Sequence, residues 1–190
     1  MLTGVPPRPK LGEYGIAKVV SGTVYVTVRG KRRQLTAVEE EIPVRAEIDT
    51  RRGRLRLAAG GGKDKPDMVG EFRGGVFLFN QLGKTDTTTV LRLSQPLGRC
   101  TAASKGRTSR TAAIRERQLW GDATGRFQIK GRYSAATVRG TVWLVRDACN
   151  RRRKHVTVTR VTSGTVEVAD RIKGKTVLVG AGRSYTARGR

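Results

Sequence analysis

The sequence of 190 residues predicts a single all-β domain, and three features lead to that prediction. Glycine is abundant at 24 residues, aromatic residues make up 5% of the chain, and valine dominates the apolar runs. Apolar and polar residues alternate along most segments, as they do on half-buried strands. Short runs of turn-forming residues separate these segments. We expect about twelve short strands that form a sandwich, a roll or a flattened β-solenoid.

The first half of the chain contains strands whose inward faces are apolar. Val24, Val26 and Val28 share one face of the first strand. One strand over residues 42–50 turns Ile42, Val44, Ala46 and Ile48 inward. The inward faces after it are Leu55 with Leu57, and Phe77 with Phe79. Residues 68–81 are expected to form a hairpin. The strand that follows places either Val90 with Arg92 or Leu91 with Leu93 on one face.

The periodicity fails between residues 99 and 118. This segment carries six basic residues against one acidic residue and few large apolar groups. We expect a mobile or weakly ordered basic excursion, tethered by Cys100. A short helix over residues 111–119 would be marginal without tertiary contacts.

The second half returns to the strand pattern. Phe127 and Ile129 face inward, and Trp143, between apolar neighbours, is expected in the core. Gly140 interrupts a strand-like run, which indicates a bulge or a close backbone approach. Strands at 155–161, 165–170 and 175–182 complete the domain.

One phrase, Ser-Gly-Thr-Val-x-Val, occurs twice, within residues 19–28 and 161–170. Each copy precedes a basic turn and another strand. We interpret its glycine as the start of a strand after a turn, with both valines facing the core. The copies are then hairpins near the two ends of one domain, and their role is packing.

The formal net charge is +24, and arginine outnumbers lysine by 28 to 11. Such a surface attracts nucleic acid, anionic polysaccharide or anionic lipid headgroups. The aromatic residues alternate with apolar partners and read as core, so nucleic-acid binding would be sequence-independent and salt-sensitive. The candidate anion-binding residues are Arg107, Arg110, Arg151, Arg152, Arg153 and Lys154.

Cys100 and Cys149 are the two cysteines, and His155 is the one histidine. A four-ligand zinc site within one chain is therefore nearly excluded, and no cofactor is expected. A disulfide would close a loop of about 50 residues and stabilise the fold by roughly 4 kcal/mol. The alternative is a pair of unpaired core cysteines in a cytosolic protein.

Catalysis is not expected from this sequence. His155 follows four basic residues and alternates with Thr157 and Thr159, which is typical of a surface strand rather than of a catalytic base. The acidic cluster at Glu39, Glu40 and Glu41 reads as a solvated loop. Walker and GxGxxG motifs are both missing from the sequence.

The segment from Gly131 to Arg188 resembles the second half of the FecR domain family. The motif Val138, Arg139, Gly140, Thr141 is followed by an apolar strand, by a G-x-V-x-V strand over 164–168, and by an apolar strand that ends at Ala181 and Gly182. In the first half, Thr50, Gly53 and Leu57 fit the family's T-x-x-G-x-x-x-L stretch. The resemblance covers about residues 16–187.

The resemblance implies an exported bacterial β domain without catalytic residues. Some such domains are periplasmic sensors of sigma-factor regulators, and others are binding or structural modules at the cell envelope. We expect a proline-rich arm at 1–14 and a FecR-like domain at 15–190, taken from a longer exported protein. The leading hypothesis is a non-enzymatic envelope or secreted module that contacts an anionic partner. The alternatives are sequence-independent nucleic-acid binding and sigma-factor regulation.

Overall fold

Fifteen strands form one continuous sheet in the computed structural model, which describes residues 7–81, 83, 87–100, 116–138 and 140–189. The strands are β1 (Tyr14–Val28), β2 (Lys31–Gln34), β3 (Glu40–Pro43), β4 (Glu47–Ala59), β5 (Met68–Arg73), β6 (Val76–Gln81), β7 (Thr89–Leu93), β8 (Arg117–Thr124), β9 (Phe127–Lys130), β10 (Ser134–Val138), β11 (Thr141–Cys149), β12 (His155–Ser163), β13 (Thr165–Asp170), β14 (Lys175–Gly180) and β15 (Ser184–Arg188). The all-β prediction is confirmed.

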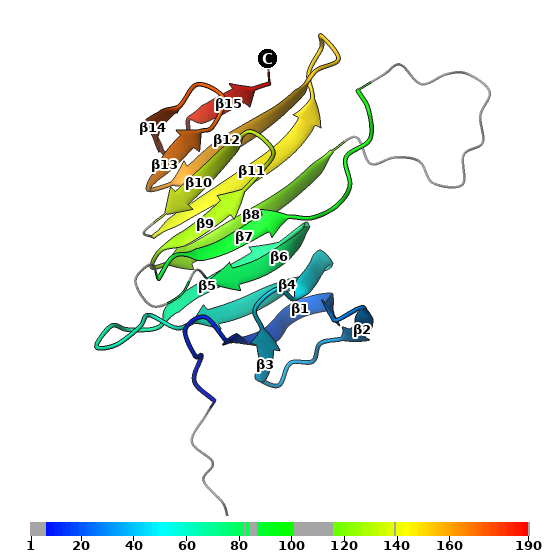
Figure 1. Cartoon of the computed structure of the whole chain (residues 1–190), viewed down its shortest axis with the longest axis vertical. Helices are drawn as coiled ribbons and strands as arrows, with labels where there is room; N and C mark the ends of the chain where they lie inside the picture. The colour runs from blue at the N-terminus through cyan, green and yellow to red at the C-terminus, as the bar shows by residue number, and fades with distance from the viewer. Residues whose placement is uncertain (1–6, 82, 84–86, 101–115, 139, 190) are drawn as a thin grey trace, which may run out of the picture.

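The sheet folds over on itself into two layers (Figure 1). Its strand order is β14-β13-β10-β9-β7-β6-β4-β5-β8-β11-β12-β15, and β1 pairs with β2, β3 and β4 beside this path. Strand β8 contacts β6, β7 and β9 across the interior, although none of them is its neighbour in the sheet. Because the end strands β14 and β15 also touch, the sheet is a nearly closed, flattened barrel.

Aromatic and aliphatic side chains from both layers fill the interior. Phe72 of β5 packs against Phe77 of β6 and Phe127 of β9, with ring centroids 5.9 and 5.3 Å apart. Trp143 is fully buried, as predicted. The predicted inward residues of β4, Leu55 and Leu57, are also fully buried. The period-two pattern therefore identified the core faces correctly.

The two copies of the repeated phrase differ in structure. The second copy fits the interpretation, because Gly164 (φ 74°) lies between β12 and β13 and starts a new strand. In the first copy Gly22 (φ 68°) lies inside the single strand β1, next to a register shift between Val19 and Ser21. A Cβ atom on Gly22 would lie 2.3 Å from the backbone oxygen of Arg52. The glycine of the first copy thus marks a bend within a strand and not a strand start, but the copy still leads into a hairpin, because Tyr25–Val28 pair with Lys31–Gln34 of β2.

Three local predictions were wrong. The segment expected as one strand over 42–50 is divided by a turn at Val44 and Arg45, where Arg45 has a φ of 69°. Strands β5 and β6 do not pair with each other, because long β4 pairs with both of them at different residues. Where a helix was suggested at 111–119, strand β8 begins at Arg117, and residues 111–115 lie outside the described residues. Strand β8 thus begins within the range given to the basic excursion.

Candidate functional site

Seven cationic side chains gather at one end of the sheet, and we call them the basic cluster. They come from four segments: the chain after β7, the β9–β10 turn, the β11–β12 turn and the end of β15. The members are Arg99, Arg132, Arg151, Arg152, Arg153, Lys154 and Arg188, all of them exposed. Sequence neighbours supply four of these residues, and the closure of the sheet brings the other three to them.

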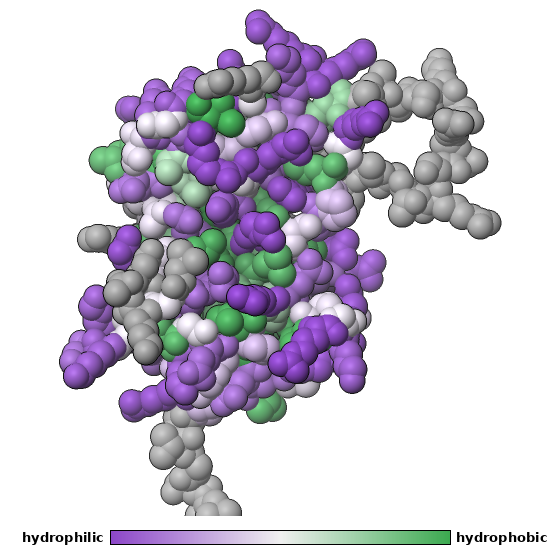
Figure 2. Space-filling model, viewed as in Figure 1, coloured by the Kyte–Doolittle hydropathy of each residue, from purple (hydrophilic) through white to green (hydrophobic). Residues whose placement is uncertain are grey.

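Two adjoining grooves run between these cations, each with a volume of about 430 Å³. The first is lined by Asn150, Arg151, Arg152, Lys154, Arg188 and Gly189. The second is lined by Leu97, Gly98, Arg99, Cys100, Arg132, Tyr133, Arg153, Lys154, His155 and Gly189. Neither lining includes a carboxylate. Hydrophilic residues dominate this end of the molecule, where the C-terminus lies (Figure 2).

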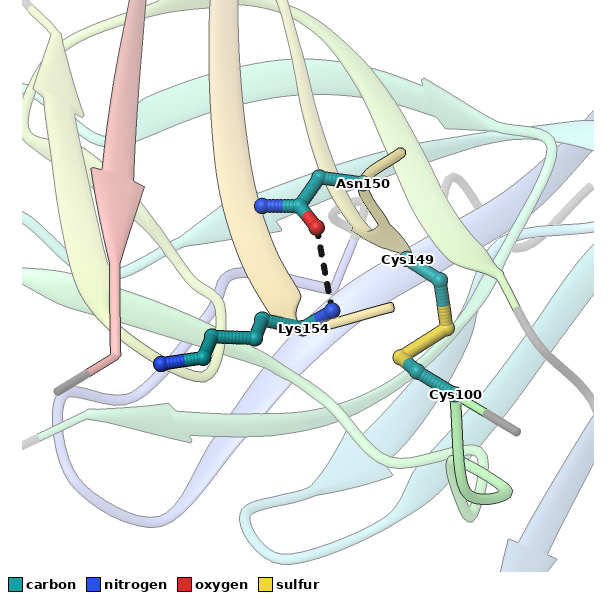
Figure 3. Close-up of a disulfide and its surroundings, with 4 residues drawn as sticks. All are labelled: Cys100, Cys149, Asn150 and Lys154. Atoms are coloured by element: carbon teal, nitrogen blue, oxygen red, sulfur yellow. Dashed lines mark hydrogen bonds between the residues drawn. A yellow bond between two sulfur atoms is a disulfide. The ribbon is translucent and has the colours of Figure 1, made fainter. Parts of the chain in front are cut away.

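The β11–β12 turn fixes the direction of four of these cations. Lys154 donates its backbone N–H to Asn150 Oδ1 over 3.0 Å, and Asn150 donates its own N–H to the carbonyl of Lys154 over 2.9 Å. Arg153 takes a left-handed backbone conformation, with a φ of 57°. This closed turn lies beside the disulfide (Figure 3). Both hydrogen bonds leave the basic side chains unengaged and directed into solvent.

Asp147 supports the cluster from inside the protein. This fully buried carboxylate of β11 accepts a 2.8 Å hydrogen bond from Arg117 Nε of β8 and a 2.5 Å hydrogen bond from Thr157 Oγ1 of β12. It also accepts the backbone N–H of Arg132 at 2.9 and 3.0 Å. Asp147 therefore joins two strands of one layer to the β9–β10 turn, which carries Arg132 into the groove.

Two further hydrogen bonds extend this network. Arg117 donates to the carbonyl of Gln95 over 2.6 Å, which ties down the segment that leads to Arg99. Tyr133 donates its backbone N–H to Thr157 Oγ1 over 2.9 Å, and the guanidinium of Arg132 lies 5.6 Å from the centre of the Tyr133 ring. One buried carboxylate thus positions three of the four segments that form the grooves.

The charges of the basic cluster are unpaired within the described structure. None of its seven side chains forms an ion pair with a described carboxylate. Near the other end of the sheet, Asp49 accepts hydrogen bonds from Arg51 at 2.7 and 2.9 Å and from Arg32 at 3.0 Å. There the arginines are neutralised, whereas at the grooves they remain available to an external anion.

Two other carboxylates, Asp49 and Asp170, have lowered pKa values, because the effect of burial is outweighed by the hydrogen bonds that they accept. Burial of Asp49 would raise its pKa, but the hydrogen bonds from Arg51 and Arg32 outweigh burial and lower the pKa below its ordinary value. Burial likewise opposes the hydrogen bonds that Asp170 accepts from Lys173, Tyr185 and Ile172, and the net effect is a lowered pKa. Burial, followed by the bond to Asp170, raises the pKa of Tyr185. These groups stabilise the fold and lie outside both grooves.

Cys100 and Cys149 form a disulfide, as predicted, and both are half-buried. His155 begins β12 and is the direct cross-strand partner of Cys149. The prediction that its strand face is a surface face was wrong, because Thr157 and Thr159 are fully buried. That face points toward Asp147, to which the Thr157 hydroxyl donates a hydrogen bond. His155 itself is half-buried in the wall of the second groove.

The structure brings together Arg151, Arg152, Arg153 and Lys154, the predicted anion-binding residues that it describes. Arg107 and Arg110 lie outside the described residues. The candidates taken from the sequence omitted Arg99, Arg132 and Arg188. Arg99 lies within the predicted basic excursion, whereas Arg132 and Arg188 stand outside any run of basic residues.

The residues that carry the FecR resemblance meet in space. Gly140 lies between β10 and β11, and its carbonyl oxygen would lie 2.8 Å from a Cβ atom placed on Gly164. Thr141 Oγ1 donates to the carbonyl of Thr165 over 3.2 Å, and Val138 is buried. Gly140 interrupts the strand run as predicted, but a Cβ atom there would meet nothing within 4 Å, so the close backbone contact is at Gly164 and not at Gly140. Arg139 lies outside the described residues. These contacts are structural and lie apart from the grooves.

Comparisons with known proteins leave the family open: no protein-family model, curated protein or solved structure matches this chain. Among the described residues, no helix is long and apolar enough to cross a bilayer.

Proposed function

We propose that this domain is a non-enzymatic binding module of a bacterial envelope or secreted protein, and that the basic cluster holds an anionic polymer of the cell envelope. The observation that carries the proposal is the convergence of seven unpaired cations from four segments on two adjoining grooves. Exposed arginines that a protein leaves without carboxylate partners bind phosphate or carboxylate groups readily.

The shape of the grooves favours a polymer over a small metabolite. The two grooves share Lys154 and Gly189, so a chain could pass from one into the other. Cations along both grooves would contact successive anionic groups, and each contact releases counterions into solution. Small-molecule sites are usually largely apolar and enclosed, which does not describe these linings.

The disulfide supports a role outside the cytoplasm. The Cys100–Cys149 bond is partly exposed, and disulfides of this kind persist in oxidising compartments. The resemblance of residues 131–188 to FecR domains agrees with export. An envelope polymer is an abundant polyanion in that location, so it is our preferred partner.

Nucleic acid fits the grooves less well. Proteins that bind single strands stack bases on aromatic side chains, and Tyr133 is the one Phe, Tyr or Trp side chain in either lining. Tyr133 is half-buried and its ring is already covered on one side by Arg132. The grooves therefore provide charge without a stacking platform.

Binding to immobilised poly(glycerol phosphate) and to a polyuronate at about 0.15 M salt tests the proposal. We expect retention on at least one polymer, with displacement by the free polymer at a lower mass concentration than single- or double-stranded DNA requires. Loss of retention on both polymers would contradict the proposal. Displacement by DNA at the lower concentration would assign the grooves to nucleic acid instead.

A further inference from the structure

The imidazole of His155 lies beside the two cysteines of the disulfide, and these three side chains could together bind a metal ion. One ligand atom from each of Cys100, Cys149 and His155 lies within 4.8 Å of the others. Among the described residues, this is the one such group of three cysteine, histidine or acidic side chains. In the oxidised protein the two sulfur atoms are bonded to each other and neither is available as a thiolate ligand.

The imidazole of His155 is not explained by the oxidised structure. Its Nδ1 atom is buried and has no hydrogen-bond partner among the described residues. A buried polar atom without a partner costs about 1–3 kcal/mol, so such an atom in a folded protein calls for a physical reason. A metal ion held between the imidazole and two sulfur atoms would supply the missing partner.

We propose that reduction of the Cys100–Cys149 disulfide creates a three-ligand site for a soft monovalent ion, Cu⁺, formed by the two thiolates and the imidazole of His155. Thiolate and imidazole are the ligands that Cu⁺ favours. Zn²⁺ at structural sites takes four ligands, and the group provides three. The site is distinct from the anion-binding role of the grooves and does not depend on it.

The surrounding charges favour a monovalent ion. Two thiolates, a neutral imidazole and Cu⁺ carry a net charge of −1. Arg99, Arg132, Arg153 and Lys154 line the same groove as Cys100 and His155. Positive side chains stabilise thiolates and an anionic complex. With Zn²⁺ the same ligands would be neutral and would gain less from this environment.

The fold keeps the ligands together after reduction. Cys149 and His155 are direct partners in the β11–β12 pairing, which does not require the disulfide. The segment before Cys100 is held by the 2.6 Å hydrogen bond from Arg117 to the carbonyl of Gln95. All three residues are half-buried, so a reductant and an ion can reach them.

The chemical steps balance with a thiol or phosphine reductant. A phosphine gives two electrons to the S–S bond and becomes a phosphine oxide by taking the oxygen atom of one water molecule. The two protons of that water convert the sulfur atoms to thiols. Binding of Cu⁺ then displaces both thiol protons into solvent, and two S–Cu bonds and one N–Cu bond form.

The test uses the full chain, reduced anaerobically with a phosphine, freed of reductant and titrated with Cu⁺ in competition with a chromogenic Cu⁺ chelator. We expect the reduced wild type to retain one Cu⁺ per chain, and the oxidised wild type and the Cys100→Ser/Cys149→Ser variant to retain none. The His155→Gln variant should bind at least about tenfold more weakly. Arg52→Gln, which removes an exposed cation of β4 outside both grooves, serves as the matched control and should stay within about threefold of wild type.

X-ray absorption at the copper edge gives a second readout that does not depend on a variant's folding. The proposal requires two sulfur neighbours and one nitrogen neighbour. A reduced wild type that releases Cu⁺ to the chelator, a copper spectrum without nitrogen, or equal affinity of His155→Gln and wild type would each overturn it. Loss of the folded circular-dichroism signal on reduction, before any Cu⁺ is added, would overturn it as well, because the site depends on the paired strands.

Discussion

Asp49 and Asp147 each form an ion pair with arginine, but they differ in burial and in the surface arginines around them. Asp49 of β4 pairs with Tyr25 of β1, and its partners Arg32 and Arg51 have side chains that are half exposed. Strands β1 and β2 lie together at one end of the molecule (Figure 1). Asp147 is fully buried, and its partner Arg117 is 15% exposed at the side chain. Asp49 neutralises surface arginines, whereas Asp147 holds in place the segments that carry the unpaired cations of the basic cluster.

This difference shows why net charge alone does not locate the function. Arginines occur at both ends of the sheet, but near Asp49 they are engaged with the protein's own carboxylate. At the basic cluster the carboxylate of Asp147 faces inward and accepts hydrogen bonds from the backbone N–H of Arg132, from Thr157 and from Arg117. The side chains of Arg132, Arg151 and Lys154 are therefore left for a partner.

Neutralising the two carboxylates one at a time should give unequal losses of stability. Asp147→Asn leaves the partly buried Arg117 without its counter-charge inside the protein and should lower the free energy of unfolding by about 3–5 kcal/mol. Asp49→Asn affects exposed partners and should lower it by about 1 kcal/mol. Urea unfolding followed by tryptophan fluorescence measures both. Equal losses would show that Asp147 is no more a framework residue than Asp49.

The disulfide adds a covalent support at the basic cluster. Removing it in Cys100→Ser/Cys149→Ser should lower the free energy of unfolding by about 2–4 kcal/mol, because the unfolded chain regains the freedom of a long loop. Wild type unfolded in the presence of reductant provides the matched control and should lose the same amount. A variant that unfolds at the wild-type urea concentration would indicate that the cross-link adds nothing to this end.

The β11–β12 turn makes a smaller contribution to stability at the basic cluster. Asn150→Ala removes the side-chain hydrogen bond to the Lys154 N–H and should cost about 0.5–1.5 kcal/mol of stability. Since the turn directs four cations, binding to the anionic polymer should weaken even though no charge is lost. Asn150→Asp keeps the acceptor and should retain the stability; because it adds a negative charge to the groove, it is compared with wild type for stability alone. Unchanged polymer binding by Asn150→Ala would mean that the turn need not be held in one conformation.

The smallest effect concerns acid sensitivity at Asp49. Its folded-state pKa is lowered, so its contribution to stability is complete above the unfolded value of about 3.9 and is lost as the pH falls through the folded value. The stability difference between wild type and Asp49→Asn should therefore be constant above about pH 5 and shrink below about pH 4. Urea midpoints at a series of pH values measure it. A difference that grows toward low pH would contradict the assignment.

The alternation of apolar residues was enough to predict the fold class and most of the inward faces, because strand periodicity is local, but it failed for the face of β12 that carries Thr157 and Thr159. It could not predict that β4 pairs with both β5 and β6, since β-pairing is decided by the whole sheet. For the candidate site, the basic run at 151–154 was visible in the sequence. Arg99, Arg132 and Arg188 join it only when distant segments meet, and Thr157 turns inward because Asp147 binds it.

We propose that the position of the cations in the basic cluster, and not the net charge of the protein, determines binding to the anionic polymer. Arg151→Gln/Arg152→Gln/Lys154→Gln removes three charges from the basic cluster. The control, Arg52→Gln/Arg56→Gln/Arg92→Gln, removes three exposed charges from β4 and β7 that form no ion pair with a described carboxylate. Both variants have the same net charge.

Salt titrations of poly(glycerol phosphate) binding compare these two variants with wild type. The cluster variant should lose about two units of the slope of log K against log salt and about tenfold or more in affinity, whereas the control should lose less than about one unit. Equal losses in the two variants would show that the polymer responds to net charge alone, and the assignment of the site to the basic cluster would be wrong.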